Sequence, residues 1–271
     1  MIMVENDCFW WYINDEVKKV LTEERYRLIL ESLERESFVK LQDLVDITES
    51  SESTIRRDLK KLEEEEKLVR VHGGARRIHH LVGEDMMEEK SLKHINEKRD
   101  IAKLAASLIR DKELVYLDAG STTYEMIPFL KGREITVITN GIPHASLLTD
   151  LGITTIQIGG KIKQRTKAVI GPEAHWQIQN YHFSKAFLGM NGIDVDYGYT
   201  TPDVEEAAIK QLVMAKSGRS FILADASKIN TVTFAKVADI EDATVITTAL
   251  SKELKALKAL LEEQTTVMEV E

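Results

Sequence analysis

The chain has 271 residues, enough for one large domain or two ordinary ones, and its 43% hydrophobic and 30% charged residues are typical of a soluble globular protein. The formal net charge of −9 excludes a global basic field for nucleic acid, so any DNA binding must come from a local patch. A single cysteine, Cys8, excludes an intramolecular disulfide, and the lack of a signal peptide or a spanning apolar run predicts a cytoplasmic protein without a membrane partner.

Residues 1–20 share no periodicity with the rest of the chain. Phe9, Trp10, Trp11 and Tyr12 stand together without helical spacing. They form either a docking arm or a disordered extension, and the sequence favours a dispensable extension.

Residues 21–77 carry the pattern of three short helices followed by a β-hairpin wing. Ser50 or Ser51 is placed to cap the third helix, and a short β stretch ends in a Gly-Gly turn at residues 73–74. Helical spacing marks the apolar side chains that face the core. They are Tyr26, Ile29, Leu30, Leu33, Leu41, Leu44, Val45, Ile55, Leu59 and Leu62.

The third helix is predicted to be a DNA-recognition helix, because burying its apolar stripe leaves hydroxyl and basic side chains on the opposite face. Arginine pairs bidentately with guanine in the major groove, and basic residues of the wing can reach the flanking backbone or minor groove. The candidate DNA-binding residues are Ser53, Thr54, Arg56, Arg57, Lys60, Arg70, His72 and Arg76.

A merely solvated charged face is the competing interpretation, since acids slightly outnumber bases between Glu23 and Arg77. We expect the excess acids to lie largely in the first helix and in the Glu63–Glu66 run, away from the DNA-facing side. The geometry therefore favours DNA binding, with an RNA-binding or protein-docking module as the alternative.

Residues 78–93 are polar without a clear period and predict a linker. Strands and helices alternate through residues 94–271, which predicts a doubly wound parallel sheet covered by helices. The predicted strands are Leu114–Leu117, Ile135–Thr139, Thr154–Ile158, Lys185–Leu188, Ser220–Ala224 and Thr244–Thr247.

Small and polar residues follow nearly every predicted strand, and ligands of open parallel sheets bind outside the carboxyl ends of the strands. Each residue alone is more typical of a turn or a helix cap. Together they favour a phosphorylated polar metabolite, since glycine allows close approach, hydroxyls donate hydrogen bonds and a helix start attracts an anion. The candidate effector-binding residues are Asp118, Gly120, Ser121, Thr122, Thr123, Asn140, Gly141, Gly160, Lys161, Asn191, Gly192, Thr200, Thr201, Glu205, Asp225 and Lys228, with Pro202 expected at the first position of a helix.

Asp118, Glu205, Asp225 and Lys228 could instead supply acid–base groups to a sugar-phosphate isomerase or deaminase. The sequence shows no Ser-His-Asp arrangement, no metal-ligand spacing and no P-loop, and the His79-His80 pair is more typical of a solvated linker. We therefore expect no catalytic residues, no cofactor and no metal. Fusion to a DNA-binding module favours sensing over turnover.

The N-terminal pattern resembles the helix-turn-helix of DeoR-type bacterial repressors. It runs Arg25-x3-Ile29-x3-Leu33, then Ser51-x2-Thr54-Ile55-Arg56-Arg57-Asp58-Leu59-x2-Leu62, then Arg70-x-His72-Gly73-Gly74-Ala75. The family usually has glycine before the wing, where this chain has Glu66 or Lys67. The resemblance implies a winged helix-turn-helix followed by a sensor domain that is similar in fold to ribose-5-phosphate isomerase and does not catalyse.

Segments of the C-terminal part resemble the fructose-operon repressors of that family. The resemblance implies a repressor of a sugar operon, acting as a dimer or tetramer, whose partners are operator duplex DNA and a phosphorylated sugar. Fructose 1-phosphate is the preferred effector, and tagatose 6-phosphate, to which lactose-operon relatives respond, is the alternative. The segments are Glu125–Leu130, Val137–Gly141, Gly159–Lys163, Gly189–Gly192 and Thr200–Asp203.

Overall fold

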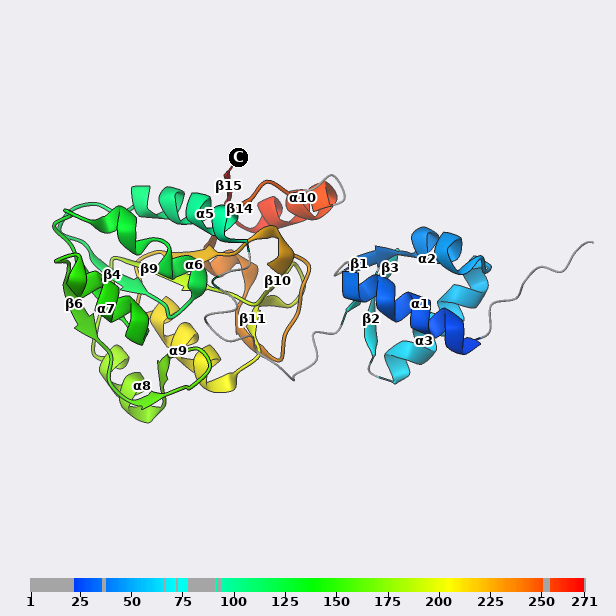
Figure 1. The fold of residues 1–271 in the computed structure, drawn as a ribbon, viewed down its shortest axis with the longest axis horizontal. Helices are drawn as coiled ribbons and strands as arrows, with labels where there is room; N and C mark the ends of the chain where they lie inside the picture. The colour runs from blue at the N-terminus through cyan, green and yellow to red at the C-terminus, as the bar shows by residue number, and fades with distance from the viewer. Residues whose placement is uncertain are drawn as a thin grey trace, which may run out of the picture. The chain divides into compact units, whose positions relative to one another are not determined.

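The computed structural model divides into two compact units, Met1–Ile78 and His79–Glu271, which are described separately (Figure 1). The predicted extension, His72, and the predicted linker apart from Ser91 lie outside the described residues. The structure describes residues 22–35, 38–65, 67–71, 73–77, 91, 94–250 and 254–270.

The N-terminal unit is a winged helix-turn-helix. Its helices are α1 (Thr22–Arg35), α2 (Leu41–Thr48) and α3 (Glu52–Glu64), and its strands β1 (Phe38–Lys40), β2 (Leu68–Val71) and β3 (Gly74–Arg77) form an antiparallel sheet in the order β1-β3-β2. The three predicted helices are confirmed. The strand β1 was not predicted, and Gly74 begins the return strand of the wing instead of completing its turn.

The start of α3 and its apolar stripe position this helix in the unit. Ser51 is the N-cap residue, and its hydroxyl accepts a hydrogen bond from the backbone N–H of Thr54 at 3.3 Å. Ile55, Leu59 and Leu62 are buried in a core that they share with residues of α1, α2 and the sheet. The face opposite this stripe is consequently left to solvent.

The second unit contains a seven-stranded parallel sheet with helices on both faces. The strand order is β15-β14-β12-β9-β4-β5-β6, with the strands β4 (Leu114–Leu117), β5 (Thr136–Thr139), β6 (Thr154–Gln157), β9 (Lys185–Gly189), β12 (Ser220–Leu223), β14 (Thr244–Thr248) and β15 (Val267–Val270). Six strands were predicted, each within one residue of its observed ends. The edge strand β15 was missed.

Two apolar cores lie on the two faces of this sheet. One joins the sheet to α5 (Ile95–Ser107), η1 (Ile127–Leu130) and α7 (Ile142–Asp150), and the other joins it to α8 (Pro172–Gln179) and α9 (Val204–Ala215), which lie on the opposite face in Figure 1. Helix α10 (Lys255–Gln264) precedes β15. The helix α9 begins after its N-cap Asp203, so the prediction that Pro202 is the first helical residue is wrong.

Short elements surround the carboxyl ends of the strands. β10 (Gly192–Asp194), β11 (Gly198–Thr201) and β13 (Ala235–Ala238) form a small antiparallel sheet that was not predicted, and β7 (Lys161–Ile162) pairs with β8 (Val169–Ile170). Single-turn helices follow β4 and β12, namely α6 (Ser121–Tyr124) and η2 (Ala226–Lys228), whereas η3 (Ile240–Asp242) precedes β14 at the opposite end of the sheet.

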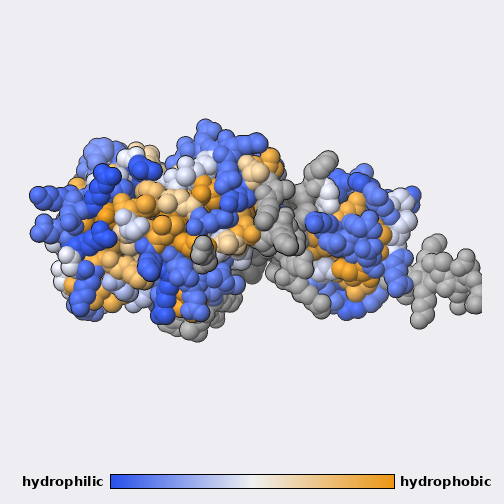
Figure 2. Space-filling view, turned by 90° about the horizontal axis from the view of Figure 1, so that it is seen from above, coloured by the Kyte–Doolittle hydropathy of each residue, from blue (hydrophilic) through white to orange (hydrophobic). Residues whose placement is uncertain are grey.

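The surface mixes hydrophilic and hydrophobic residues, as the view in Figure 2 shows. In the part of the chain that the structure describes, no helix is long and apolar enough to cross a membrane.

Candidate functional site

The outward face of α3 carries the side chains that the sequence assigned to DNA. Ser53, Arg56, Arg57 and Lys60 are all exposed. Thr54 is only half-exposed, and its hydroxyl lies 2.9 Å from that of Ser51, within the cap of the helix. The face therefore presents three cations and a hydroxyl to a partner.

A buried ion pair fixes α3 against α1. Arg25 donates from Nε to Oδ2 of Asp58 at 2.6 Å and from Nη2 to Oδ1 at 3.2 Å. The two side chains are 11% and 8% exposed, so the pair is shielded from salt and holds the recognition helix in place. The sequence pattern included both residues without assigning this role to them.

The expectation that the excess acids lie away from the DNA-facing side holds for those of α1, such as Glu24 and Glu31, but is wrong for Glu64. Glu52 accepts from Arg56 at 2.5 Å, and Glu64 lies 3.8 Å from the ammonium of Lys60. Arg57 has no ion-pair partner among the described residues. Acids at both ends of α3 are therefore within reach of the candidate DNA-binding cations between them.

The first strand of the wing is tied to the end of α3 through Arg70. Its Nε donates to Glu63 Oε2 at 2.6 Å, and its backbone N–H donates to Glu63 Oε1 at 2.9 Å. Arg76 lies in β3, opposite Phe38 and Val69. Its side chain, like His72, lies outside what the structure describes.

In the second unit, Asp118 follows β4 and forms a buried ion pair with Lys210 of α9. Lys210 Nζ donates to Asp118 Oδ2 and to the carbonyl oxygen of Gly189 at 2.9 Å, while the Gly189 N–H donates to Asp118 Oδ2 at 3.2 Å. Both charged side chains are 6% exposed. Asp118 Oδ1 has no partner among the described residues, so one carboxylate oxygen is available to a ligand.

The predicted turn Gly120–Thr123 begins two residues after Asp118. Thr123 Oγ1 donates to the carbonyl oxygen of Asp118 at 2.6 Å and accepts from the Gly120 N–H at 3.1 Å, so this hydroxyl stabilises the turn. The hydroxyls of Ser121 and Thr122 have no partner in the described structure and are available. The helix α6 has only four residues, so its dipole contributes less to anion binding than the sequence suggested.

The sequence did not identify His144, which lies behind this turn. Its Nε2 is 3.0 Å from the carbonyl oxygen of Gly120 and 3.2 Å from Thr123 Oγ1. Burial lowers the pKa of His144 to about 4, against the raising effect of Asp118, so the imidazole is neutral at pH 7. Nδ1 lies against Gly141, where an added Cβ would be 2.4 Å away, and this contact explains the glycine.

The buried Asn140 is engaged in structural hydrogen bonds. Its Oδ1 accepts from the Ala119 N–H at 3.1 Å, and its Nδ2 donates to the carbonyl oxygen of Val169 at 3.1 Å. It joins the ends of β4 and β5 to β8. Its predicted contact with an effector stays a prediction.

Asp225 follows β12 and is 2% exposed. Burial raises its pKa, but the charge of Lys228 and hydrogen bonds from Ser227 lower it below the ordinary value overall. Lys228 is half-buried beside this carboxylate. Asp225 and Lys228, both predicted effector residues, therefore lie at one strand end, where the charge of Lys228 acts on the Asp225 carboxylate.

Several predicted residues meet around the small sheet. Thr201 donates to Asn191 Oδ1 at 3.0 Å, and Thr200 Oγ1 accepts from the Thr233 N–H at 2.9 Å. A Cβ on Gly192 would lie 2.4 Å from the carbonyl oxygen of Thr231. These contacts account for the small residues here without any ligand.

The segment from β7 to β8 is attached to the start of α9 by ion pairs. Lys161 pairs with Glu205 at 3.0 Å, and Lys163 pairs with Asp203 and with Glu206, both at 3.0 Å. Two predicted effector residues, Lys161 and Glu205, thus bind each other. Gly160 has a φ of 148° and would place a Cβ 2.8 Å from the carbonyl oxygen of Ile170, so it serves the turn.

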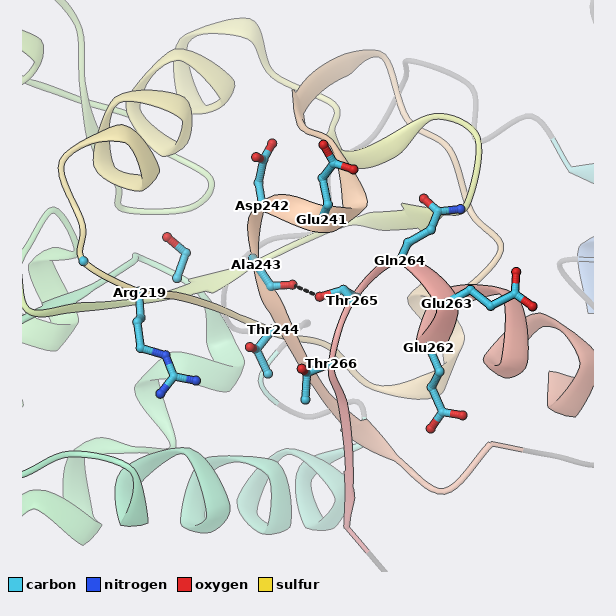
Figure 3. A pocket seen from close by; sticks show the side chains of 12 residues that line it. Arg219, Glu241, Asp242, Ala243, Thr244, Glu262, Glu263, Gln264, Thr265 and Thr266 are labelled. Carbon is cyan, nitrogen blue, oxygen red and sulfur yellow. Dashed lines mark hydrogen bonds between the residues drawn. The ribbon is translucent and has the colours of Figure 1, made fainter.

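A surface hollow lies at the amino ends of β12, β14 and β15, opposite the ends that carry these residues (Figure 3). Four acidic side chains and Arg219 contribute to its lining, and in Figure 3 the guanidinium of Arg219 is not paired with them. The surplus of negative charge disfavours a phosphorylated ligand. The acids are Glu241, Asp242, Glu262 and Glu263.

Comparison with known families matches both units. Residues 25–80 match the DeoR-like helix-turn-helix domain, and residues 93–249 match the DeoR C terminal sensor domain. The chain is similar to a ribose 5-phosphate isomerase A from Methanocaldococcus jannaschii over 51% of its own length and 55% of that chain, with 17% identity and a TM-score of 0.39.

Whole-chain relatives are also found. The HTH-type transcriptional regulator FruR of Bacillus subtilis is 44% identical over 84% of this chain and 92% of its own length. The regulator YulB of the same organism is 32% identical over 93% of this chain and 98% of its own. A lactose phosphotransferase system repressor of Staphylococcus epidermidis is 30% identical over 78% of this chain and 85% of its own length.

Fold, outward helix and family matches together define a transcriptional regulator: a winged helix-turn-helix joined to an α/β sensor. The matched domains cover most of the chain, and the relatives extend over nearly their full lengths. The chain belongs to the DeoR family of HTH-type transcriptional regulators.

Proposed function

We propose that this protein represses a sugar-utilisation operon and that this operon serves the use of fructose. The protein leaves its operator when a phosphorylated sugar binds the sensor domain. The observation that carries the proposal is the 44% identity to FruR over 84% of this chain, because it covers both units. The predicted organisation belongs to the proposal: a dispensable extension at residues 1–20, a DNA-binding domain at 21–77, a linker at 78–93 and a sensor at 94–271.

The α3 face supports the DNA-binding half. Arg56 and Arg57 are exposed on α3, and the Arg25–Asp58 ion pair holds this helix against α1. The two arginines can therefore enter the major groove and pair with guanine. One short helix contacts few bases. We therefore infer a dimer or tetramer that acts on operator DNA in the cytoplasm and places paired modules at two half-sites.

The carboxyl edge of the parallel sheet supports the sensing half. Asp118 Oδ1 provides a fixed acceptor for a sugar hydroxyl, and the hydroxyls of Ser121 and Thr122 have no competing partner. Lys161 and Lys228 are the candidate partners for phosphate. Lys161 would have to exchange its contact with Glu205 for the ligand.

The preferred effector is fructose 1-phosphate, because the segments that follow the strands resemble fructose-operon repressors. Tagatose 6-phosphate is the alternative. The similarity to the staphylococcal lactose phosphotransferase system repressor, at 30% identity, is lower than that to FruR, at 44%. This order of similarity favours the fructose assignment.

The states of the candidate acid–base groups favour a sensor over a sugar-phosphate isomerase. A general base acting near neutral pH needs a pKa close to 7, whereas the pKa of Asp225 is lowered. Asp118 is paired with Lys210, and Glu205 is paired with Lys161. Weak isomerase activity is the second candidate function, and these pairings disfavour it.

The test uses the full chain and a duplex that it selects from a random pool. Operator affinity is measured by gel shift with fructose 1-phosphate, tagatose 6-phosphate, fructose 6-phosphate and inorganic phosphate, while NMR follows each sugar for turnover. Release by fructose 1-phosphate without conversion supports the proposal. Conversion without any change in affinity supports the isomerase.

A further inference from the structure

The outward side of α3 carries acids as well as cations. At about 100° per residue, Glu52, Glu63 and Glu64 fall on the same side of the helix as Arg56 and Lys60. The core-facing stripe lies on the other side, with Ile55, Leu59 and Leu62 buried. Acids therefore lie at both ends of the row of cations on the surface that faces DNA in the proposed function.

The distances show that Glu52 and Glu64 pair with two of the cations in the free protein, Arg56 and Lys60, whereas Arg57 has no ion-pair partner among the described residues. Arg56 donates to Glu52 Oε1 from Nη2 at 2.5 Å and from Nε at 2.9 Å, and these side chains are 63% and 58% exposed. Lys60 and Glu64 lie 3.8 Å apart at 65% and 64% exposure. Such exposed pairs contribute little to folding. Glu52 also complements the helix dipole in the first turn of α3, whereas Glu64, in the last turn, opposes it, so stability does not account for Glu64.

Glu63 pairs with a cation of the wing, Arg70. It accepts both the backbone N–H and the side chain of Arg70, at 2.9 and 2.6 Å. Burial raises its pKa, but the hydrogen bonds and the charge of Arg70 lower it overall, so Glu63 keeps its negative charge at neutral pH. That charge is held beside a cation that the sequence assigned to DNA.

We propose that Glu52, Glu63 and Glu64 are specificity-determining residues, which weaken binding to DNA of arbitrary sequence more than binding to the operator. The inference rests on the proposed function. Binding to arbitrary sequence depends on neutralising phosphates. An acid within about 10 Å, the Debye length at 0.1 M salt, opposes every such contact.

These acids lower the affinity for the operator less, because contacts to bases also contribute to operator binding. Arg56 has five N–H donors, and Glu52 engages those of Nε and Nη2. The guanidinium can keep Glu52 on one side and present its remaining donors to guanine on the other. Glu52 then orients the contact to a base, while its charge still repels the backbone.

The variant Glu52→Gln with Glu64→Gln tests this proposal in the full chain. Glutamine keeps the shape and helix propensity of glutamate and removes two negative charges from the DNA-facing side. The matched control is Glu24→Gln with Glu31→Gln. These two acids pair with Arg27 on α1, at 46% and 41% exposure, and are not on the recognition helix.

Gel shifts compare the duplex that the wild-type chain selects from a random pool with a scrambled duplex of equal length, from 50 to 200 mM salt. We expect the α3 variant to bind the scrambled duplex roughly three- to tenfold more tightly at 0.1 M salt, with a smaller gain on the selected duplex and a steeper salt slope. The ratio of the two affinities then falls. The control variant should differ from wild type by less than about twofold on both duplexes.

Equal gains on both duplexes, or no gain on either, overturn the proposal, as does an equal effect of the α1 control. Melting temperatures of both variants within about a degree or two of wild type show that folding is intact. Glu52→Gln alone repeats the test without Glu64. A wild-type chain that binds no duplex overturns the proposed function itself, which is a different outcome from a variant without effect.

Discussion

Lys210 donates from one ammonium group to Asp118 Oδ2 and to the carbonyl oxygen of Gly189, the latter at 2.9 Å. A single buried cation thus joins α9 to the ends of β4 and β9, at the edge of the sheet where the effector is proposed to bind. Removing either charge leaves the other unpaired in a site where both side chains are 6% exposed.

We therefore expect Lys210→Met to destabilise the sensor unit by about 3–5 kcal/mol, the usual cost of an uncompensated buried charge. The double variant Asp118→Asn with Lys210→Met should recover much of this loss, because no unpaired charge remains. Urea unfolding of the single and double variants measures both effects. Additive losses would show that the two residues do not interact in solution.

A second prediction concerns acid stability. Because burial lowers the pKa of His144 from 6.5 to about 4, the unfolded chain binds a proton between these pH values that the folded chain does not. Stability should therefore fall as the pH decreases from about 6.5 to about 4, by roughly 3 kcal/mol for this group alone.

His144→Gln can still donate to Gly120 but does not titrate. The free energy of unfolding of this variant should not show the decrease between pH 6.5 and 4 that His144 causes, even if the substitution lowers that free energy at pH 7. Urea unfolding at pH 7, 6, 5 and 4.5 gives the difference between the two proteins. Parallel curves for wild type and variant would show that His144 is not buried and neutral as described.

The sequence predicted local features well, and the reason is physical. Ser51, the stripe through Ile55 and the six strands all follow from residue spacing along one segment. The strands β1 and β15 were not predicted, because a short edge strand shows little pattern of its own and is defined by the strand with which it pairs. Phe38–Lys40, for example, pairs with Gly74–Arg76, some 36 residues away.

The charged residues of the sites were harder to predict. Lys210 lies three residues after Ala207 and three before Val213, both buried, and a cation on such a stripe is the one local sign of a buried partner. The partner itself, Asp118, is 92 residues away. The position of Glu64 was mispredicted for a different reason: the helix was expected to run into Glu63–Glu66, but residue spacing alone does not show that Glu64 lies within reach of Lys60.

The third prediction concerns the recognition helix. Arg56→Ala with Arg57→Ala should remove specific operator binding, at a cost of about 1–3 kcal/mol for each contact to a base. Both side chains are exposed, so the fold should persist. Gel shifts at fixed salt measure the loss, with Arg27→Ala on α1 as the control. Unchanged operator affinity would contradict the assignment of α3 to the major groove.

The fourth prediction concerns the effector site. A Cβ at Gly120 would lie 3.2 Å from Thr123 Oγ1 and 3.6 Å from the Cα of Gly189, so Gly120→Val adds bulk at the proposed site in a backbone conformation that valine can adopt. The variant should still bind operator but no longer release it. Melting temperature with and without sugar phosphate separates loss of binding from loss of folding.

Lys228→Ala should give the same constitutive repression, because it removes a cation beside Asp225 that is available to phosphate. Lys131→Ala is the matched control, an exposed lysine that precedes β5. Operator release is measured by gel shift for both. If release survives in both Gly120→Val and Lys228→Ala, the effector binds elsewhere.

The central claim is that one chain couples operator binding to a sugar phosphate. The most direct measurement is the affinity of the full-length protein for its selected operator duplex as fructose 1-phosphate is added at constant salt. The account predicts that affinity falls by roughly 5- to 150-fold, the range of typical coupling free energies, while the sugar phosphate is recovered unchanged. Operator affinity that stays constant with every sugar phosphate, in a protein that binds the duplex specifically, would contradict it.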